Sequence, residues 1–206
     1  MKACTTGLPM RDDFLSVVLA AGRASRFGGG KLDAACAGKP VGAHVLSAIG
    51  NAGIASGIII VPKETPTFAA AASEWEKVVN ERAQSGLGSS LALAARIASA
   101  RGFPALLVIL ADMPLLSPDF LKTLIASVPP AATRYPPGRP GVPALLPASL
   151  FPHLGKLEGD RGATALLTGR NDLTLVEPSP DMLIDVDTQD DLARAARLLR
   201  SRADGR

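Results

Sequence analysis

The sequence predicts an α/β fold in which a mostly parallel central sheet is covered by helices. Short apolar runs rich in Val and Ile recur along the chain, and stretches with helical periodicity separate them. Hydrophobic residues make up 47% of the 206 residues, which is enough for a full core. The strands expected from the apolar runs cover residues 14–20, 57–61, 77–80, 105–110 and 182–186.

Three helices can be placed from their start signals. One is expected to begin near residues 89–90, where two serine hydroxyls can cap free N–H groups, and a second at the Ser-Pro pair 117–118. A third is expected to begin at Thr188, because Asp191 three residues later completes a capping box. The residues expected to be buried are Leu91, Ala94, Ala95 and Ala98 in the first helix, Leu121, Leu124, Ile125 and Val128 in the second, and Leu192, Ala195, Ala196 and Leu199 in the third.

The same pattern suggests how the chain is divided. We expect a single domain over residues 14–200, preceded by an N-terminal extension over 1–13 and followed by a disordered tail over 201–206. The proline-rich segment 129–152 interrupts the alternation of strands and helices. We interpret it as an excursion over the strand ends and not as a linker between domains.

Composition narrows the classes of partner. The formal net charge is +3, but the basic residues are scattered and form no block with interleaved aromatic residues, so we expect no nucleic-acid binding. Cys4 and Cys36 fit neither a redox pair nor a zinc pattern and are expected to be free thiols in a reducing compartment. The sequence shows neither a signal-peptide stretch nor an apolar run of membrane-helix length. We therefore expect a cytoplasmic protein without membrane contact.

A glycine-rich loop directly follows the first expected strand. Residues 17–32 read VVLAAGRASRFGGGKL, and Gly22 and the glycines at 28–30 let the main chain approach a phosphate closely. Arg26 and Lys31 add positive charge, and Lys31 is expected to lie in an exposed loop. The segment therefore predicts a polyphosphate site at the carboxyl edge of the sheet, although a surface loop using glycine for its turns alone would show the same composition.

Two well-known phosphate loops can be excluded. In the pattern G-x-x-x-x-G-K-[ST], Ser25 stands in place of the first glycine and Leu32 in place of the hydroxyl residue. In the pattern G-x-G-x-x-G, Ala24 replaces the second glycine. The loop is therefore of a third kind.

The pattern L-A-A-G-x-x-S-R-x-G-x-x-K over residues 19–31 resembles the nucleotidyltransferases of the molybdenum-cofactor type. These enzymes couple a nucleoside triphosphate to a phosphorylated acceptor and release pyrophosphate. The resemblance implies a Rossmann-like three-layer nucleotidyltransferase fold. It implies catalytic roles for Arg26, Lys31 and Asp112, and nucleotide binding by Leu19, Ala20, Ala21, Gly22, Ser25, Arg26, Gly28 and Lys31.

Later segments extend the resemblance over most of the chain. Residues 84–91 are similar to the family's second nucleotide-side loop, and 110–121 to its metal-binding strand end. Residues 139–147 and 157–167 are similar to its acceptor-side segments, and 183–192 to its closing strand and helix. These segments imply nucleotide binding by Gly86, Ser89 and Ser90, and acceptor binding by Pro143, Asp160 and Arg161.

Two short motifs favour one branch of the family. Gly-Asp-Arg-Gly-Ala, together with Ala-Ala-Gly in the first loop, resembles the molybdenum-cofactor cytidylyltransferases, whereas the guanylyltransferases usually have Ala-Gly-Gly in that loop. The chain departs from the family after the lysine, where Gly42 stands in place of a bulky apolar residue. The residue Asp160 has an alternative interpretation as a helix cap.

Carboxylates at strand ends are the expected metal ligands. Transfer of a nucleotidyl group joins two anionic partners, and Mg²⁺ held by one or two carboxylates neutralises their charge. Asp112 follows the strand at 105–110, and Asp185 follows an apolar run in the same way. Alternatively, Asp112 could simply begin a turn. Asp185 and Asp187 would face opposite sides of a strand. We favour Asp185, which resembles the metal aspartate of sugar nucleotidyltransferases, and keep Asp187 as the alternative.

The leading hypothesis from the sequence is a magnesium-dependent enzyme that transfers CMP from CTP to a molybdopterin-type cofactor. The expected partners are small-molecule substrates and, transiently, a molybdoenzyme or chaperone. One alternative is a guanylyl- or cytidylyltransferase for another phosphorylated acceptor, such as a sugar or isoprenoid precursor. Another is a catalytically silent module that binds nucleotide and delivers cofactor.

Overall fold

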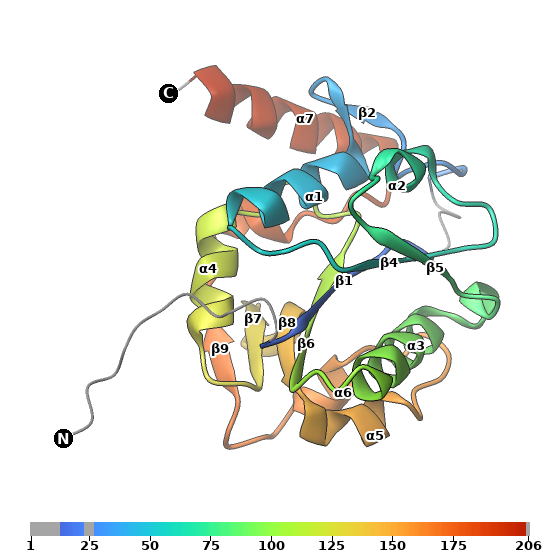
Figure 1. Ribbon diagram of the computed structural model, residues 1–206. Coiled ribbons are helices and arrows are strands. Elements are labelled where there is room, and N and C mark those ends of the chain that lie inside the picture. Colours follow the sequence, from blue (N-terminus) through green and yellow to red (C-terminus); the bar gives the residue numbers. More distant parts are fainter. Residues whose placement is uncertain (1–12, 23–26, 205–206) are drawn as a thin grey trace.

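The computed structural model describes residues 13–22 and 27–204, and within them a seven-stranded sheet has the order β5-β4-β1-β6-β8-β7-β9 (Figure 1). β1 pairs in parallel with β4 and β6, and β4 in parallel with β5, whereas β8 runs antiparallel to both β6 and β7. The sheet is therefore mostly parallel, as predicted. Its strands are β1 Leu15–Leu19, β4 Ile58–Val61, β5 Glu76–Val79, β6 Ala105–Leu110, β7 Ala131–Tyr135, β8 Arg139–Pro147 and β9 Thr174–Val176.

Helices cover both faces of this sheet and give three layers (Figure 1). Side chains alternate along β1, so Val18 contacts one helical layer and Val17 contacts the other. The first layer contains α1 Val41–Asn51, α2 Thr67–Ala71, α4 Pro118–Ala126 and α7 Gln189–Asp204, and the second contains α3 Leu87–Ala100, α5 Phe151–Leu154 and α6 Thr164–Leu167. A small hairpin, β2 Ala35–Cys36 and β3 Lys39–Pro40, precedes α1.

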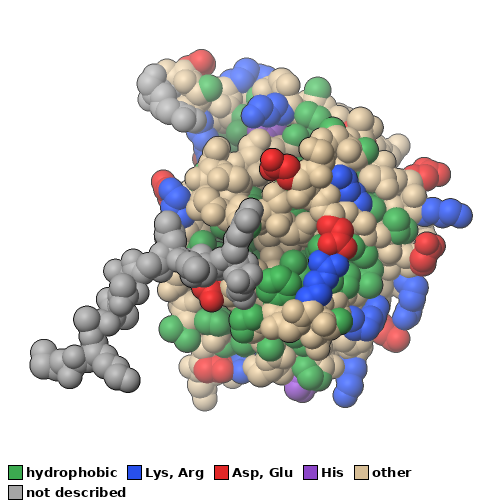
Figure 2. Space-filling view, viewed as in Figure 1, with side chains coloured by type: hydrophobic (Ala, Val, Ile, Leu, Met, Phe, Trp, Pro, Cys, Tyr) green, Lys and Arg blue, Asp and Glu red, His purple; other side chains and the backbone are tan. Residues whose placement is uncertain are grey.

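Charges of both signs are mixed on the surface that Figure 2 shows. Figure 2 shows Lys and Arg side chains interspersed with Asp and Glu on the visible face, without one large basic patch. Among the described residues, none of the helices has the length and apolar character needed to cross a lipid bilayer.

The expected strand at 182–186 is wrong. Residues Pro180–Leu183 form a 3₁₀ turn, and the chain that follows is irregular. One backbone hydrogen bond, from Val186 N to Asp112 O at 2.9 Å, holds this segment beyond the end of β6. The run is apolar because Met182 and Val186 are buried in the core, and not because the segment pairs as a strand.

The interpretation of residues 129–152 as an excursion over the strand ends is also wrong. The segment contributes β7 and β8 to the sheet, and β8 lies next to β6. Pro143 is compatible with the strand because the pairing of β7 with β8 shifts register between Ala132 and Thr133, which leaves Val142 and Pro143 out of the regular ladder. The Thr133 hydroxyl then donates a hydrogen bond to the Pro143 carbonyl at 2.8 Å.

The helix start signals are partly confirmed. Ser117 Oγ accepts a hydrogen bond from Phe120 N at the start of α4. At α7, Thr188 and Asp191 form the reciprocal capping box, with Thr188 N to Asp191 Oδ2 at 2.9 Å and Asp191 N to Thr188 Oγ1 at 3.2 Å. The helix expected near residues 89–90 instead begins at Leu87, after Gly86.

The helix ends also differ from expectation. α4 ends at Ala126, so Val128 is 79% exposed and not buried. α7 continues to Asp204, so the tail expected to be disordered from residue 201 is helical as far as the structure describes it. The buried positions of the three helices otherwise lie in the core or pack against it.

The glycine at position 42, unusual by comparison with the family that the sequence resembles, has a packing role. A Cβ at Gly42 would lie 2.5 Å from the Phe68 ring, which is 4% exposed. The aromatic ring of α2 therefore fills the space that a side chain on α1 would need, and the two helices approach closely at this point.

We expect Gly42→Ala to lower the free energy of unfolding by about 1–3 kcal/mol, because the new methyl group displaces a buried ring. Gly50→Ala is the matched control, since Gly50 lies in the same helix and an added Cβ meets no atom of the described residues within 4 Å. This control should be neutral or stabilising by up to about 1 kcal/mol. Urea unfolding of both variants provides the measurement, and equal stabilities would contradict the packing role of Gly42.

Candidate functional site

A cavity of about 460 Å³ opens at the carboxyl ends of β1 and β6. This is the sheet edge at which parallel α/β folds bind their ligands. The described lining comes from five parts of the chain that are far apart in sequence. It consists of Leu19, Ala20, Ala21, Gly22, Lys31, Leu32, Ala83, Gly86, Leu87, Ser90, Leu110, Asp112, Asp160 and Asp187.

The end of β1 forms one wall of the cavity. Ala20 N donates a hydrogen bond to Ile60 O at 2.8 Å, so the chain stays tied to β4 one residue beyond the strand. Ala21 follows and is 7% exposed. The predicted residues Ser25 and Arg26 lie outside the described residues. Gly28 is described, with a φ of 88° that favours glycine, but it does not line the cavity.

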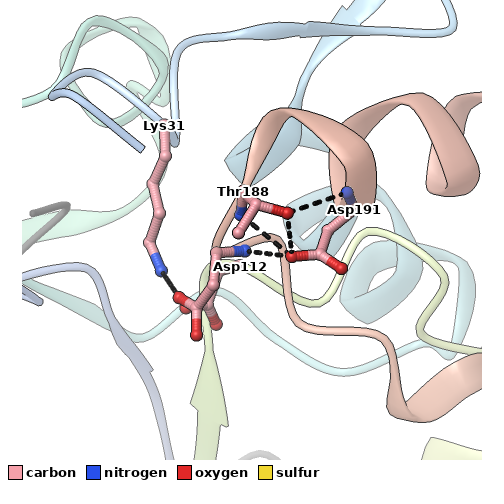
Figure 3. Close-up of polar contacts among 5 residues, drawn as sticks. Lys31, Asp112, Thr188 and Asp191 are labelled. Carbon is pink, nitrogen blue, oxygen red and sulfur yellow. Dashed lines mark hydrogen bonds and ion pairs between the residues drawn. The ribbon is translucent and has the colours of Figure 1, made fainter. Parts of the chain in front are cut away.

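Lys31 is buried, contrary to the expectation of an exposed loop. Its side chain is 8% exposed, and Nζ lies 2.7 Å from Asp112 Oδ2 (Figure 3). The same Nζ lies 2.8 Å from Asp187 Oδ1. Burial alone lowers the pKa of Lys31, but the attraction of Asp112 and the hydrogen bonds to both carboxylates outweigh it, so the pKa is raised. The ammonium group is therefore charged and is held at the end of β6.

Asp112 and Asp185 each have one carboxylate oxygen that is buried without a hydrogen-bond partner among the described residues. Burial, followed by repulsion from Asp112 and Asp187, raises the pKa of Asp185 to about 7. Burial therefore contributes most to this shift, and Asp112 is the carboxylate that contributes most after it. A buried carboxylate oxygen without a partner costs free energy. A bound metal cation would supply the missing partner.

Asp185 and Asp187, the two candidates for the second metal ligand, do not lie in a strand. Asp187 lines the cavity and pairs with Lys31, whereas Asp185 is not among the described lining residues. Because the segment is not a strand, the argument that the two side chains face opposite sides does not apply. The described residues contain no group of three or more His, Cys, Asp or Glu side chains that could hold a metal ion by themselves. Mg²⁺ needs no such cage, because it usually keeps several waters and binds one or two carboxylates together with substrate phosphates.

The start of α3 forms the opposite wall. Gly86 and Ser90 line the cavity, but Ser89 does not. The Ser89 hydroxyl is 2.8 Å from Gly86 O and accepts a hydrogen bond from Asn80 Nδ2 at 2.9 Å. Asn80 also donates to Ser90 Oγ at 3.0 Å, so it fixes the first turn of the helix from the end of β5.

The predicted acceptor-side residues separate in the structure. Asp160 lines the cavity, whereas Arg161 is exposed and Pro143 is buried within β8, both outside the described lining. The alternative that Asp160 caps a helix is wrong, because Ala163 occupies the N-cap of α6. Asp160 instead packs against α3.

The contact between residues 159–160 and α3 depends on glycine. A Cβ at Gly86 would lie 2.4 Å from Asp160 Oδ1 and 2.5 Å from Gly159 O. Gly88 N also donates a hydrogen bond to Gly159 O at 2.9 Å. The predicted nucleotide-side loop and one predicted acceptor-side segment are therefore in direct contact.

Several residues that line the cavity could not be predicted from the sequence. Leu32, Ala83, Leu87 and Leu110 line the cavity, but they are apolar residues in ordinary core patterns and carry no chemical signal. The pairing of Asp187 with Lys31 was also missed. It depends on residues 156 positions apart, which no local spacing relates.

We expect Lys31→Met to lower the free energy of unfolding by about 1–3 kcal/mol, because it leaves Asp112 and Asp187 without their shared cation. Adding Asp187→Asn to this variant should recover part of the loss. Lys122→Met is the control, because its ion pair with Asp119 is exposed and should matter by less than about 0.5 kcal/mol. Chemical unfolding measures all three, and equal losses for Lys31→Met and Lys122→Met would show that the buried pairs do not stabilise the fold.

Comparison with known families gives one match over most of the chain. Residues 16–174 match the family described as MobA-like NTP transferase domain. This range includes the end of β1, Lys31, Asp112 and Asp160, but not Asp185 or Asp187.

Individual relatives agree with this match. The purine catabolism protein PucB of Bacillus subtilis is 31% identical over an alignment of 206 residues that covers 91% of this chain and 99% of PucB. The crystal structure of Rv0371c from Mycobacterium tuberculosis has a TM-score of 0.74 and 27% identity, covering 90% of this chain and 97% of that one. A structure of Rv0371c in complex with manganese has a TM-score of 0.71 and 26% identity, covering 90% and 98% of the two chains.

Proposed function

Because this chain belongs to the MobA-like NTP transferase domain family and is a nucleotidyltransferase, we propose that it transfers CMP from CTP to a molybdopterin-type phosphorylated acceptor, with release of pyrophosphate. The observation that carries the proposal is the cavity at the carboxyl ends of β1 and β6. Within it, the Leu19–Gly22 turn, Lys31 and Asp112 lie at one edge of the sheet. The proposal also includes a cytoplasmic location and transient contact with a molybdoenzyme or chaperone, both inferred from the sequence alone.

The proposed reaction brings two anionic groups together. A phosphate oxygen of the acceptor attacks the α-phosphorus of the nucleotide, and the bond to the departing pyrophosphate breaks, so negative charge must be neutralised on both sides. In the proposal, Lys31 moves from the carboxylates to the leaving phosphates, where its charged ammonium group balances the developing charge. Arg26, together with the main chain at Gly22, Ser25 and Gly28, contacts the same triphosphate.

A divalent cation fits the carboxylates beside the cavity. We propose that Asp112 and Asp185 hold Mg²⁺, because each has a buried carboxylate oxygen without a partner among the described residues. Asp187 is the alternative to Asp185, since it lines the cavity but already binds Lys31. The bound ion would supply positive charge at the α-phosphate. The manganese complex of the relative Rv0371c supports a divalent metal in this kind of fold.

The walls of the cavity suggest where each substrate binds. We propose that the nucleotide lies between Leu19–Gly22 and the start of α3, where Gly86 and Ser90 face the cavity and Ser89 supports their turn. The acceptor is proposed to bind on the side of Asp160, with Arg161 and Pro143 contributing from the surrounding loops. The contact between Asp160 and Gly86 would place the two substrates next to each other.

Pyrophosphate release tests the proposal directly. CTP and GTP would each be incubated with the protein, Mg²⁺ and a panel of acceptors that includes molybdopterin, a sugar phosphate and an isoprenoid phosphate. Release with CTP and molybdopterin alone is the expected result. Release with another acceptor would replace the acceptor assignment, and absence of release with every acceptor would favour a silent nucleotide-binding module.

We expect Asp112→Asn to lower turnover by about 10²-fold or more, because the amide keeps the shape of the side chain but loses the charge that holds a cation. Asp119→Asn, on the exposed surface of α4, is the matched control and should behave as the wild type. Turnover is measured beside calorimetric titration with Mn²⁺. Unchanged metal binding in Asp112→Asn would remove Asp112 from the metal site.

The choice of base is expected to depend on Ala21. Its methyl group lies in the cavity wall and narrows the space where we place the base, so a pyrimidine should fit better than a purine. Discrimination by shape of one small group is about 1–3 kcal/mol, or roughly 10–200-fold in kcat/KM. Ala21→Gly should therefore reduce the preference for CTP over GTP. A wild-type protein that prefers GTP would refute the cytidylyl assignment without affecting the fold or the metal site.

A further inference from the structure

Asp33 lies two residues after Lys31 and binds the start of another helix. Its carboxylate accepts hydrogen bonds from Thr67 N at 2.8 Å and from Phe68 N at 2.7 Å. Pro66, at the N-cap of α2, has no side-chain oxygen to offer these N–H groups. Asp33 therefore caps α2 from a segment 34 residues earlier in the chain.

The turn that carries both Lys31 and Asp33 is tightly bonded. Asp33 N donates to Gly30 O at 3.0 Å, and Ala34 N donates to Lys31 O at 3.3 Å. The start of α1 holds the same turn, because Gly42 N donates to Leu32 O at 3.0 Å. Lys31 and Asp33 are therefore carried by one hydrogen-bonded turn.

Phe68 completes the connection between the turn and the core. Its N–H group binds Asp33, and its ring fills the space above Gly42 in α1. The turn is thus held by α2 through Asp33, by α1 through Leu32 and by the site carboxylates through Lys31. Asp33 lies on the α2 side of the turn and Lys31 on the cavity side.

We propose that Asp33 is a positioning residue that sets the place of the Lys31 ammonium group in the site. This inference rests on the proposed function, in which Lys31 acts on the triphosphate. Hydrogen bonds to a carboxylate are short and strong, so two of them can fix the turn against α2. A displacement of about 1 Å at a catalytic group can cost up to about 10²-fold in rate, so a loosened turn should be visible in kinetics.

Removal of the carboxylate provides the first test. Asp33→Ala should lower kcat by about 10-fold with a much smaller change in the KM for nucleotide, because the lysine would lose its alignment in the transition state. Asp33→Asn keeps one acceptor oxygen in place and should restore most of the lost kcat. Glu76→Ala, at the amino end of β5, is the control, since it also removes a carboxylate that accepts two hydrogen bonds, here from Arg101, and it should leave kcat unchanged.

A double variant tests whether Asp33 acts through Lys31. If it does, Asp33→Ala should cause no further loss of kcat in a Lys31→Ala background, since residues that act as a unit are not additive. Additive losses would overturn the proposal. So would a normal kcat in Asp33→Ala, provided that Lys31→Ala is impaired.

Normal turnover in Lys31→Ala would contradict the role of Lys31 in the proposed function. This result is distinct from a failure of the role of Asp33 alone. Thr67→Pro covers the case in which Asp33→Ala does not fold, because it removes one N–H donor while proline is tolerated at the first position of a helix. This variant should lower kcat in the same direction as Asp33→Ala, and unchanged kcat in it would overturn the proposal.

Discussion

The ion pairs of Lys31 with Asp112 and Asp187 organise the site. They join the loop after β1, the end of β6 and the segment before α7, which lie far apart in the sequence. With Asp185, three carboxylates gather near this sheet edge, and they would repel each other strongly without a positive charge beside them. The buried Lys31 ammonium group, paired with Asp112 and Asp187, offsets part of this negative charge. In the proposed function, the same groups bind a metal ion and a triphosphate.

The sheet explains why these groups meet. β1 and β6 are parallel neighbours, so the residues that follow them emerge at the same edge, and Ala111 N even continues the pairing to Leu19 O at 3.0 Å. Helices on both faces bury the strands and leave this edge open. Position at the end of a strand therefore matters more to the site than any local property of the residues.

Much of this arrangement could be predicted because it follows from local pattern. The apolar runs located β1, β4, β5 and β6, and the end of a buried strand placed Asp112 at the sheet edge where the cavity opens. The strands β7 and β8 could not be predicted in this way. Pro143 of β8 lies where the register shifts and regular pairing is absent, and such a shift is visible only once both strands are paired. The burial of Lys31 was equally hidden, because its ion-pair partners lie 81 and 156 residues away in the sequence.

The close contact of Gly86 and Gly88 with residues 158–160 limits how such a site can diversify. Carbonyl and carboxylate oxygens already occupy the volume of a methyl group at Gly86, and at Gly88 the nearest backbone atoms would lie 3.0 Å away. The loop at 158–160 therefore cannot change its path without reshaping the start of α3, which lines the cavity and which the proposed function assigns to the other substrate. Variation that adapts one half of the cavity to a new molecule must be matched by variation in the other half, so the two specificities are expected to change together among proteins with this contact.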